Sequence, residues 1–261
     1  MRGDFGGSDV HEARGCLWYR LAVALVLAPL NAVVRHDWRF AARLPGAGGV
    51  IVAANHISNA DPLVLGWFVH RNGRQARFLA KEEVFRLPVL GPLFRRAGQI
   101  PVRRGRVEAF AALAEARRVL ADGGCIVIYP EGTITKDPDG WPMVARTGLA
   151  RLALETGVPV VPVGQWGAQD LRRLLRWSPP VVRVSVGEPV DLTPFRGRPL
   201  TGTLLREATE SVMDAVLEQV VAVRGGTPPP LPFDPGATAT SPPEPQSRPA
   251  QTRPGAHRRP A

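Results

Sequence analysis

His56 and Asp61 are the residues whose types and spacing first suggest chemistry. An apolar run from Val50 to Ala54 predicts a buried strand that delivers the histidine to its end. Asp61 follows five residues later, and Asp61-Pro62 is typical of a helix start with Asp61 as the N-cap. A carboxylate facing an imidazole can hold it in the tautomer that acts as a general base. The pair alone is weak evidence, because a strand-end histidine and a plain helix cap give the same pattern.

Two further apolar runs end in residues that suit the same site. A strand from Cys125 to Tyr129 opens into the turn Glu131-Gly132-Thr133, which contains a glycine and exposes backbone N–H groups. A shorter strand over 100–102 leads to Arg103 and Arg104, whose guanidinium groups suit bidentate phosphate binding. If these strands are parallel neighbours of the first one, all three ends open on the ligand side of one α/β sheet.

The common catalytic motifs are missing from the sequence. It has no G-x-S-x-G elbow, no G-x-x-x-x-G-K-[ST] phosphate loop and no G-x-G-x-x-G, and its His and Cys spacings do not make a zinc site. A His–Asp pair without a protein nucleophile suggests that the nucleophile is the substrate's own hydroxyl.

The charge balance indicates acidic partners. The chain has 33 Lys plus Arg against 23 Asp plus Glu, and its net charge of +10 favours phosphorylated small molecules, an anionic membrane surface or nucleic acid. A nucleic-acid partner is supported by the net charge alone, since the sequence has no interleaved basic and aromatic surface or known binding motif. The two cysteines, Cys16 and Cys125, form no C-x-x-C pair, which favours a reduced cytosolic location. Cys125 is expected to be a small buried apolar residue.

Strands alternate with helices along the middle of the chain. The expected strands lie at 38–42, 50–54, 77–80, 100–102, 125–129, 158–163 and 181–186. The expected helices follow Asp61 and span 107–122, 147–156 and 201–224. This order predicts an α/β fold, a mixed, largely parallel sheet covered by helices on both faces.

The two ends of the chain differ from this core. Residues 1–16 are polar and Gly-rich and are expected to be flexible, and 36–225 form the main domain. Residues 226–261 are rich in Pro, Gly, Ser, Thr and Ala, which predicts a disordered Pro-rich tail.

Residues 17–35 predict an apolar helix associated with a membrane. The uninterrupted apolar part, Leu21 to Leu30, is shorter than the ~20 residues that a spanning helix needs. Trp18 and Tyr19 near its start suit the headgroup level, so the helix is expected to lie in the interface. A core helix of the same domain is the alternative. Residues 171–177, which pair Leu and Trp with Arg, are either a second interfacial patch or a solvated helix.

Four blocks in order resemble the 1-acylglycerol-3-phosphate acyltransferases and their glycerolipid acyltransferase relatives. Asn55-His56 with Asp61 is similar to the family's N-H-x-x-x-x-D. Residues 81–104 resemble its segment with a Pro-x-x-Gly turn and an Ile-x-x-x-Arg ending. Residues 129–133, Y-P-E-G-T, resemble its F-P-E-G-T-R, and residues 158–163 resemble its V-P-[IV]-[IV]-P-V strand. The resemblance therefore covers about Asn55 to Val163.

The resemblance implies an enzyme that moves an acyl group from an acyl thioester to a hydroxyl. His56 would take the proton from the hydroxyl of a lysophospholipid, and Asp61 would hold the imidazole. The resemblance also implies that the acceptor's phosphate binds to Arg104, with Lys81 and Arg103. It further implies that Glu131 and Gly132 shape the acceptor site, with Thr133 close by. It implies no metal, no cofactor and no covalent intermediate; acyl-CoA or acyl carrier protein would be the co-substrate.

One position departs from the family pattern. The Arg that follows Gly-Thr in the family is Ile134 here, so a phosphate would need Lys136, Arg104 or Arg146 instead, or the acceptor would differ. The insert 135–144 is expected to border the acceptor's entrance.

The leading hypothesis is synthesis of phosphatidate from 1-acylglycerol-3-phosphate in phospholipid biosynthesis. One alternative keeps the reaction but changes the acceptor to another lysophospholipid or a glycolipid. The other alternative is a noncatalytic lipid-surface protein of the same fold. The expected location is the cytoplasmic face of the cell membrane, as a peripheral or monotopic protein.

Overall fold

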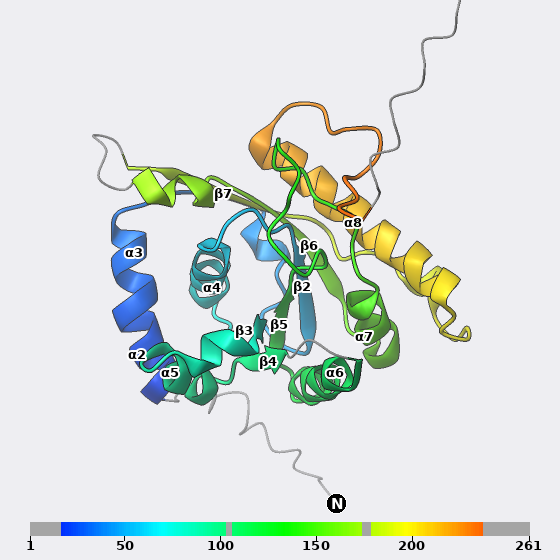
Figure 1. Ribbon diagram of the computed structural model, residues 1–261, viewed down its shortest axis with the longest axis horizontal. Coiled ribbons are helices and arrows are strands. Elements are labelled where there is room, and N and C mark those ends of the chain that lie inside the picture. The colour runs from blue at the N-terminus through cyan, green and yellow to red at the C-terminus, as the bar shows by residue number, and fades with distance from the viewer. Residues whose placement is uncertain (1–16, 103–105, 174–178, 237–261) are drawn as a thin grey trace, which may run out of the picture.

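The computed structural model describes residues 17–102, 106–173 and 179–236. Seven strands form one sheet in the order β1-β7-β6-β2-β5-β3-β4 (Figure 1). Their bounds are β1 Arg35–Arg39, β2 Val50–Ala54, β3 Ala76–Lys81, β4 Ile100–Val102, β5 Cys125–Ile128, β6 Val160–Trp166 and β7 Val181–Val186. All neighbouring pairs run parallel except β6 with β7. The predicted mixed, largely parallel sheet is therefore confirmed.

The strand β2 lies inside the sheet and is buried on both faces. Its side chains alternate, so Val50, Val52 and Ala54 face one layer of helices while Ile51 and Ala53 face the other. All five residues have no exposed surface. A strand in this position must be apolar on both faces, which explains the continuous apolar run in the sequence.

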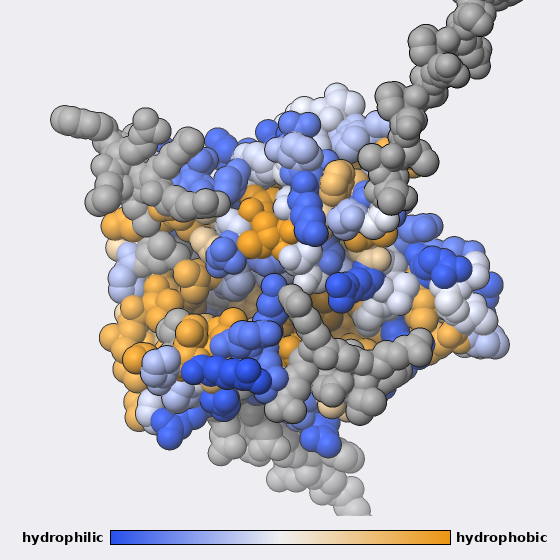
Figure 2. All heavy atoms as spheres, viewed as in Figure 1, coloured by the Kyte–Doolittle hydropathy of each residue, from blue (hydrophilic) through white to orange (hydrophobic). Residues whose placement is uncertain are grey.

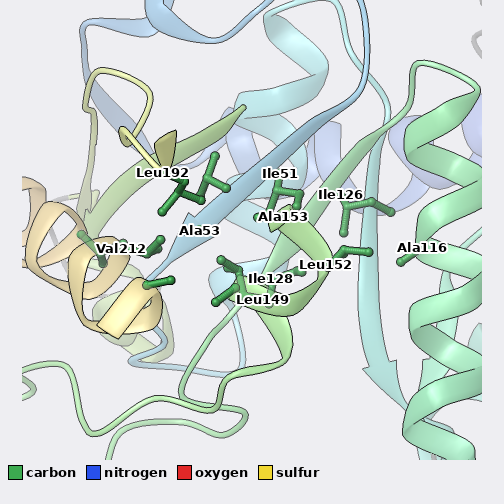
Figure 3. Close-up of a cluster of buried hydrophobic side chains, with 14 of the residues drawn as sticks. Ile51, Ala53, Ala116, Ile126, Ile128, Leu149, Leu152, Ala153, Leu192 and Val212 are labelled. Carbon is green, nitrogen blue, oxygen red and sulfur yellow. The ribbon is translucent and has the colours of Figure 1, made fainter. Parts of the chain in front are cut away.

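Helices cover both faces of the sheet. On one face, α4 Asp61–Arg71 packs Leu65 and Phe68 against the sheet. On the other face lie α6 Arg106–Ala121, α7 Gly148–Thr156 and α8 Gly202–Arg224. Figure 3 shows Leu149, Leu152 and Ala153 of α7 beside Ile51 of β2, with Val212 of α8 at one end of the same core. The sheet is therefore covered by a cluster of buried apolar side chains on each face.

The N-terminal segment is one helical stretch on the outside of this framework. It comprises α2 Leu17–Ala22, the π-helical turn η1 Val23–Leu27 and α3 Ala28–Ala32. Among the side chains of 17–32 that the structure describes, only Tyr19 is buried, so the alternative of a core helix is wrong. The helix ends before residue 35 because β1 begins there. In the described part of the chain, no helix has the length and apolar character required to cross a membrane.

Several element boundaries differ from the sequence predictions by one to three residues. The strand expected at 158–163, for example, is β6 Val160–Trp166. The first strand covers Arg35–Arg39 and pairs in parallel with β7, whereas the sequence placed it at 38–42. Of residues 171–177, the first three belong to a 3-10 helix, Ala168–Arg173, and 174–178 lie outside the described residues. The charged residues at the start of β1 hide its first residues from sequence analysis, because pairing with β7 rather than apolar character defines them.

The segment after α8 folds back onto the domain. The Val144 N–H donates to the carbonyl of Phe233 at 3.0 Å, and Met143 and Phe233 form a parallel bridge. The interpretation of 226–261 as a disordered tail is therefore wrong for 226–236, whereas 237–261 lie outside the described residues. Composition missed this contact because it depends on backbone pairing with residues about 90 positions earlier in the chain.

Candidate active site

Strand β2 delivers His56 to the carboxyl edge of the sheet, beside Asp61 at the start of α4. The His56 Nδ1 and the Asp61 Oδ2 are 2.8 Å apart. The Asp61 side chain is fully buried, whereas 15% of the His56 side chain is exposed. The predicted pair therefore exists, with its carboxylate inside the protein and its imidazole at the surface of the site.

Asp61 does not act as the N-cap that its sequence context suggested. Helix α4 begins at Asp61 itself, and the N-cap residue is Ala60, which makes no side-chain cap bond. The carboxylate instead turns back and accepts hydrogen bonds from the Ile57 N–H at 2.6 Å and the Ser58 N–H at 2.9 Å. Asp61 thus holds the loop that carries His56, because the loop folds around the carboxylate.

These bonds define the proton positions. An ionised carboxylate only accepts hydrogen bonds, so His56 Nδ1 carries the proton and Nε2 keeps its lone pair. Ser58 Oγ donates to Asp61 Oδ1 at 2.7 Å, so its proton is already engaged. Burial raises the pKa of the Cys125 thiol to about 12, which makes Cys125 unreactive. Neither Ser58 nor Cys125 is therefore placed as a nucleophile.

The Tyr129 ring packs against the face of the His56 imidazole. The two rings stack with 4.2 Å between centroids and 14° between planes. Burial raises the pKa of the Tyr129 hydroxyl well above 10, and the charge of Asp61 raises it further, whereas the side chain of Gln165 lowers it. Tyr129 is therefore neutral, and it limits rotation of the His56 ring by packing.

Asn55 ties the end of β2 to its parallel neighbour β6. Its Oδ1 accepts from the Gln165 N–H at 2.9 Å and its Nδ2 donates to the Gln165 carbonyl at 3.1 Å. The Gln165 side chain donates back to the Asn55 carbonyl at 2.8 Å. Both residues have no exposed surface. This network positions the backbone immediately before His56.

Glu131 links the loop after β5 to the backbone of His56. Its Oε1 accepts from the His56 N–H and its Oε2 from the Met143 N–H, each at 2.9 Å. Glu131 is only 3% exposed. Burial raises its pKa from 4.5 to about 7, against the two N–H donors that lower it, and the charges of Asp61 and Asp137 raise it further. Glu131 is a positioning residue, since both oxygens are engaged by backbone.

The insert 135–144 contacts the backbone of His56. The Thr135 N–H donates to the His56 carbonyl at 2.7 Å, and the Thr135 Oγ1 donates to the Trp141 carbonyl at 2.7 Å. The guanidinium of Arg224, at the end of α8, lies over the Trp141 ring at 3.8 Å. The insert is therefore held both by the backbone of His56 and by α8.

Of the remaining predicted residues, Lys81, Gly132 and Thr133 lie in the described part of the chain. Lys81 ends β3 at the same edge of the sheet and is exposed. Gly132 has φ = +71°, a conformation that favours glycine, and Thr133 beside it is half-buried. Arg103 and Arg104 follow β4 but lie outside the described residues. The ends of β2, β3, β4 and β5 share one edge, as predicted, because these strands run parallel.

Sequence reasoning missed several contributors to the site. Asn55 and Ser58 lie inside the histidine motif, and their position beside His56 was the available signal. No local pattern in the sequence indicates Gln165, because its contact with Asn55 spans 110 positions. Met143 contributes only a backbone N–H, which side-chain chemistry does not reveal.

The sequence is similar to known acyltransferases. A model of the acyltransferase family matches residues 36–166, half of the chain. A 1-acyl-sn-glycerol-3-phosphate acyltransferase from Borreliella burgdorferi is 31% identical over 144 residues, covering 55% of this chain and 54% of the relative. One of the same name from Haemophilus influenzae is 26% identical over 147 residues, covering 56% and 59%. The chain spans about half the length of these curated relatives.

The fold also resembles a solved structure. The crystal structure of the 1-acyl-sn-glycerophosphate acyltransferase PlsC from Thermotoga maritima superposes with a TM-score of 0.53 and 24% sequence identity. The match covers 82% of this chain and 88% of that one, and it shows a shared fold. Because the family model spans both halves of the site, from His56 to Gln165, the chain belongs to the acyltransferase family.

Proposed function

We propose that the protein transfers an acyl group from an acyl thioester to the free hydroxyl of 1-acylglycerol-3-phosphate, producing phosphatidate. The observation that carries this proposal is the His56–Asp61 pair, with Nδ1 bound to a buried carboxylate and the imidazole partly exposed. The names of the Borreliella and Haemophilus relatives support the choice of acceptor.

The chemistry follows from the proton positions. His56 Nε2 takes the proton of the acceptor hydroxyl while its oxygen bonds to the thioester carbonyl carbon. The tetrahedral intermediate then collapses, the C–S bond breaks, and the thiolate takes the proton from the imidazolium. Asp61 stabilises the charged imidazole and Tyr129 keeps its orientation. Positioned base catalysis contributes about 10²- to 10⁴-fold, and alignment of hydroxyl and thioester supplies further acceleration.

The substrate-binding roles belong to the same proposal. Lys81, Arg103 and Arg104 bind the acceptor's phosphate, and Gly132 and Thr133 line its site. Lys81 is exposed at the carboxyl edge of the sheet, which supports its part. The donor is acyl-CoA or acyl carrier protein.

The test uses purified protein, a labelled acyl thioester and a panel of lysophospholipid and glycolipid acceptors. Both acyl-CoA and acyl carrier protein are offered as donors. His56→Ala is expected to lower kcat about 10²- to 10⁴-fold. His36→Ala is the matched control, because His36 is an exposed histidine on β1. Equal transfer by His56→Ala and His36→Ala would exclude the base assignment, and transfer to a different acceptor would replace lysophosphatidate.

We also propose that the protein binds the cytoplasmic face of the membrane through its N-terminal helix. Large apolar side chains are exposed on 17–27 and on the loop before α5 Leu90–Arg96. These side chains are Leu17, Trp18, Leu21, Leu25, Leu87 and Val89. Figure 2 shows apolar residues gathered on the side of the molecule where α2 and α5 lie. Arg96 of α5 lies over the Trp18 ring at 4.3 Å, which brings positive charge beside the apolar residues.

Two exposed leucines test this membrane proposal. The double substitution Leu21→Glu and Leu25→Glu is expected to reduce sedimentation with anionic phospholipid vesicles, because each carboxylate would have to enter the interface. Leu231→Glu is the control, since Leu231 is also exposed but lies in the segment after α8. Sedimentation of the double variant to the same extent as the control would contradict the proposal.

A further inference from the structure

Arg146 lies against the turn at Gly132, immediately beside the His56 loop. A Cβ atom placed on Gly132 would lie 3.1 Å from Nε and 3.5 Å from Cζ of Arg146, so the absence of a side chain lets the guanidinium rest on the turn. The Arg146 N–H also donates to the Pro130 carbonyl at 2.9 Å. Its backbone and its side chain therefore both contact the loop that carries Glu131.

The charge of Arg146 is not neutralised by the described residues. Arg43 pairs with Glu188 at 2.7 Å and Arg151 with Glu155 at 3.5 Å. Within residues 17–102, 106–173 and 179–236, by contrast, no ion pair or side-chain hydrogen bond of Arg146 is formed. Glu131 is near, but both of its oxygens accept backbone N–H groups. The exposed guanidinium thus keeps its donors available to a ligand.

The turn itself offers further donors. The N–H groups of Thr133 and Ile134 donate to no acceptor among the described residues, and the preceding Gly132 has φ = +71°. Successive free N–H groups at a left-handed glycine form a concave surface that attracts anions. A guanidinium beside such a turn adds charge and paired donors, a combination that suits phosphate.

We infer that Arg146, together with the N–H groups of Thr133 and Ile134, also binds the phosphate of the acceptor, in addition to the cations proposed above. The inference rests on the proposed function for the identity of the acceptor. The Thr135 N–H bonds to the His56 carbonyl, so this turn leads directly to the base. In lysophosphatidate the free hydroxyl and the phosphate ester stand on adjacent carbons, so a phosphate bound at the turn brings the hydroxyl to His56.

Lys136 is the competing cation, and its position is less suitable. Lys136 is exposed on the insert, and only its backbone is anchored, by an N–H that donates to the sulfur of Met143 at 3.0 Å. No contact fixes the Lys136 ammonium within the part of the chain that the structure describes. Arg146 is instead held against the turn, so it loses less freedom on binding.

Binding without an acyl donor separates this inference from catalysis. Lysophosphatidate and a monoacylglycerol of the same chain are titrated in mixed micelles against wild type, Arg146→Gln, Lys136→Gln and Arg206→Gln. Arg206 is an exposed arginine near the start of α8, about 27 Å along the helix from Arg224, which contacts the insert. Acyl transfer by wild type is measured separately.

Wild type is expected to bind lysophosphatidate in preference to the neutral lipid. Arg146→Gln is expected to weaken lysophosphatidate binding about 10- to 100-fold without changing monoacylglycerol binding, whereas Lys136→Gln and Arg206→Gln keep the preference. A wild type without the preference, equal loss of both lipids in Arg146→Gln, or loss of the preference in Lys136→Gln would overturn the inference. If the preference depends on Arg146 but no acyl transfer occurs, the phosphate site stands and the proposed function fails.

Discussion

Replacing Glu131 with glutamine tests whether one buried carboxyl braces the catalytic loop and makes the fold pH-dependent. In the folded protein burial raises the Glu131 pKa from 4.5 to about 7. The folded state therefore holds a proton that the unfolded chain releases at lower pH. The stability that this proton contributes is fully present below pH 4.5 and is lost as the pH rises through 7. Because one pKa unit corresponds to about 1.4 kcal/mol, the loss is about 3 kcal/mol.

The substitution removes this titration but also disturbs two hydrogen bonds. Each Glu131 oxygen accepts one backbone N–H, from His56 or Met143. Glutamine has one oxygen, so its NH₂ group would face an N–H donor, at a cost of about 1–3 kcal/mol. We therefore expect Glu131→Gln to be less stable than wild type at pH 5, with the difference shrinking or reversing at pH 8.

Urea unfolding at several pH values between 4.5 and 8 measures the difference in unfolding free energy between the two proteins. At each pH, the unfolding free energy of the variant is subtracted from that of wild type. The contributions of histidines and other groups that both proteins share then cancel. A difference that changes by about 3 kcal/mol in favour of the variant as the pH rises agrees with a buried, bracing carboxyl. A difference that stays constant across this range would refute the reasoning.

Two other changes probe the supports of the site. Asn55→Ala removes both side-chain bonds to the Gln165 backbone in a fully buried position. The unfolding free energy should fall by about 2–5 kcal/mol, and kcat should fall with it. An unchanged denaturant midpoint would show that this hydrogen-bond network is dispensable. Ending the chain after Gly225 removes Phe233, the acceptor of the Val144 N–H, and should lower kcat several-fold, whereas a chain ending after 236 should behave as wild type. Equal kcat for the two truncations would show that the segment does not support the insert.

The elements that position the site were largely predictable from local patterns. Continuous apolar runs indicated β2 and β5, and their parallel pairing was expected from the alternation of strands with helices. The His56–Asp61 pair was proposed from spacing and from the resemblance of four motifs. These features depend on neighbouring residues, so a pattern of a few positions was enough.

Contacts between distant segments were not predictable in the same way. The link between Asn55 and Gln165 spans 110 positions, and that between Glu131 and the His56 N–H spans 75. The order of the strands decides such contacts, and it placed β2 between β5 and β6. Residues 226–236 show the same limit, since their Pro-rich composition conceals the pairing of Phe233 with Met143.

The sequence by itself determined the strands, the helices and the residue types available for base catalysis, because side-chain periodicity and motif spacing are local properties. Only the tertiary structure decided how Asp61 is used. Its carboxylate binds the loop of His56 rather than capping its own helix, since that loop folds back over the start of α4. The tertiary structure likewise placed the guanidinium of Arg146, 14 positions after Gly132, on the turn beside the base.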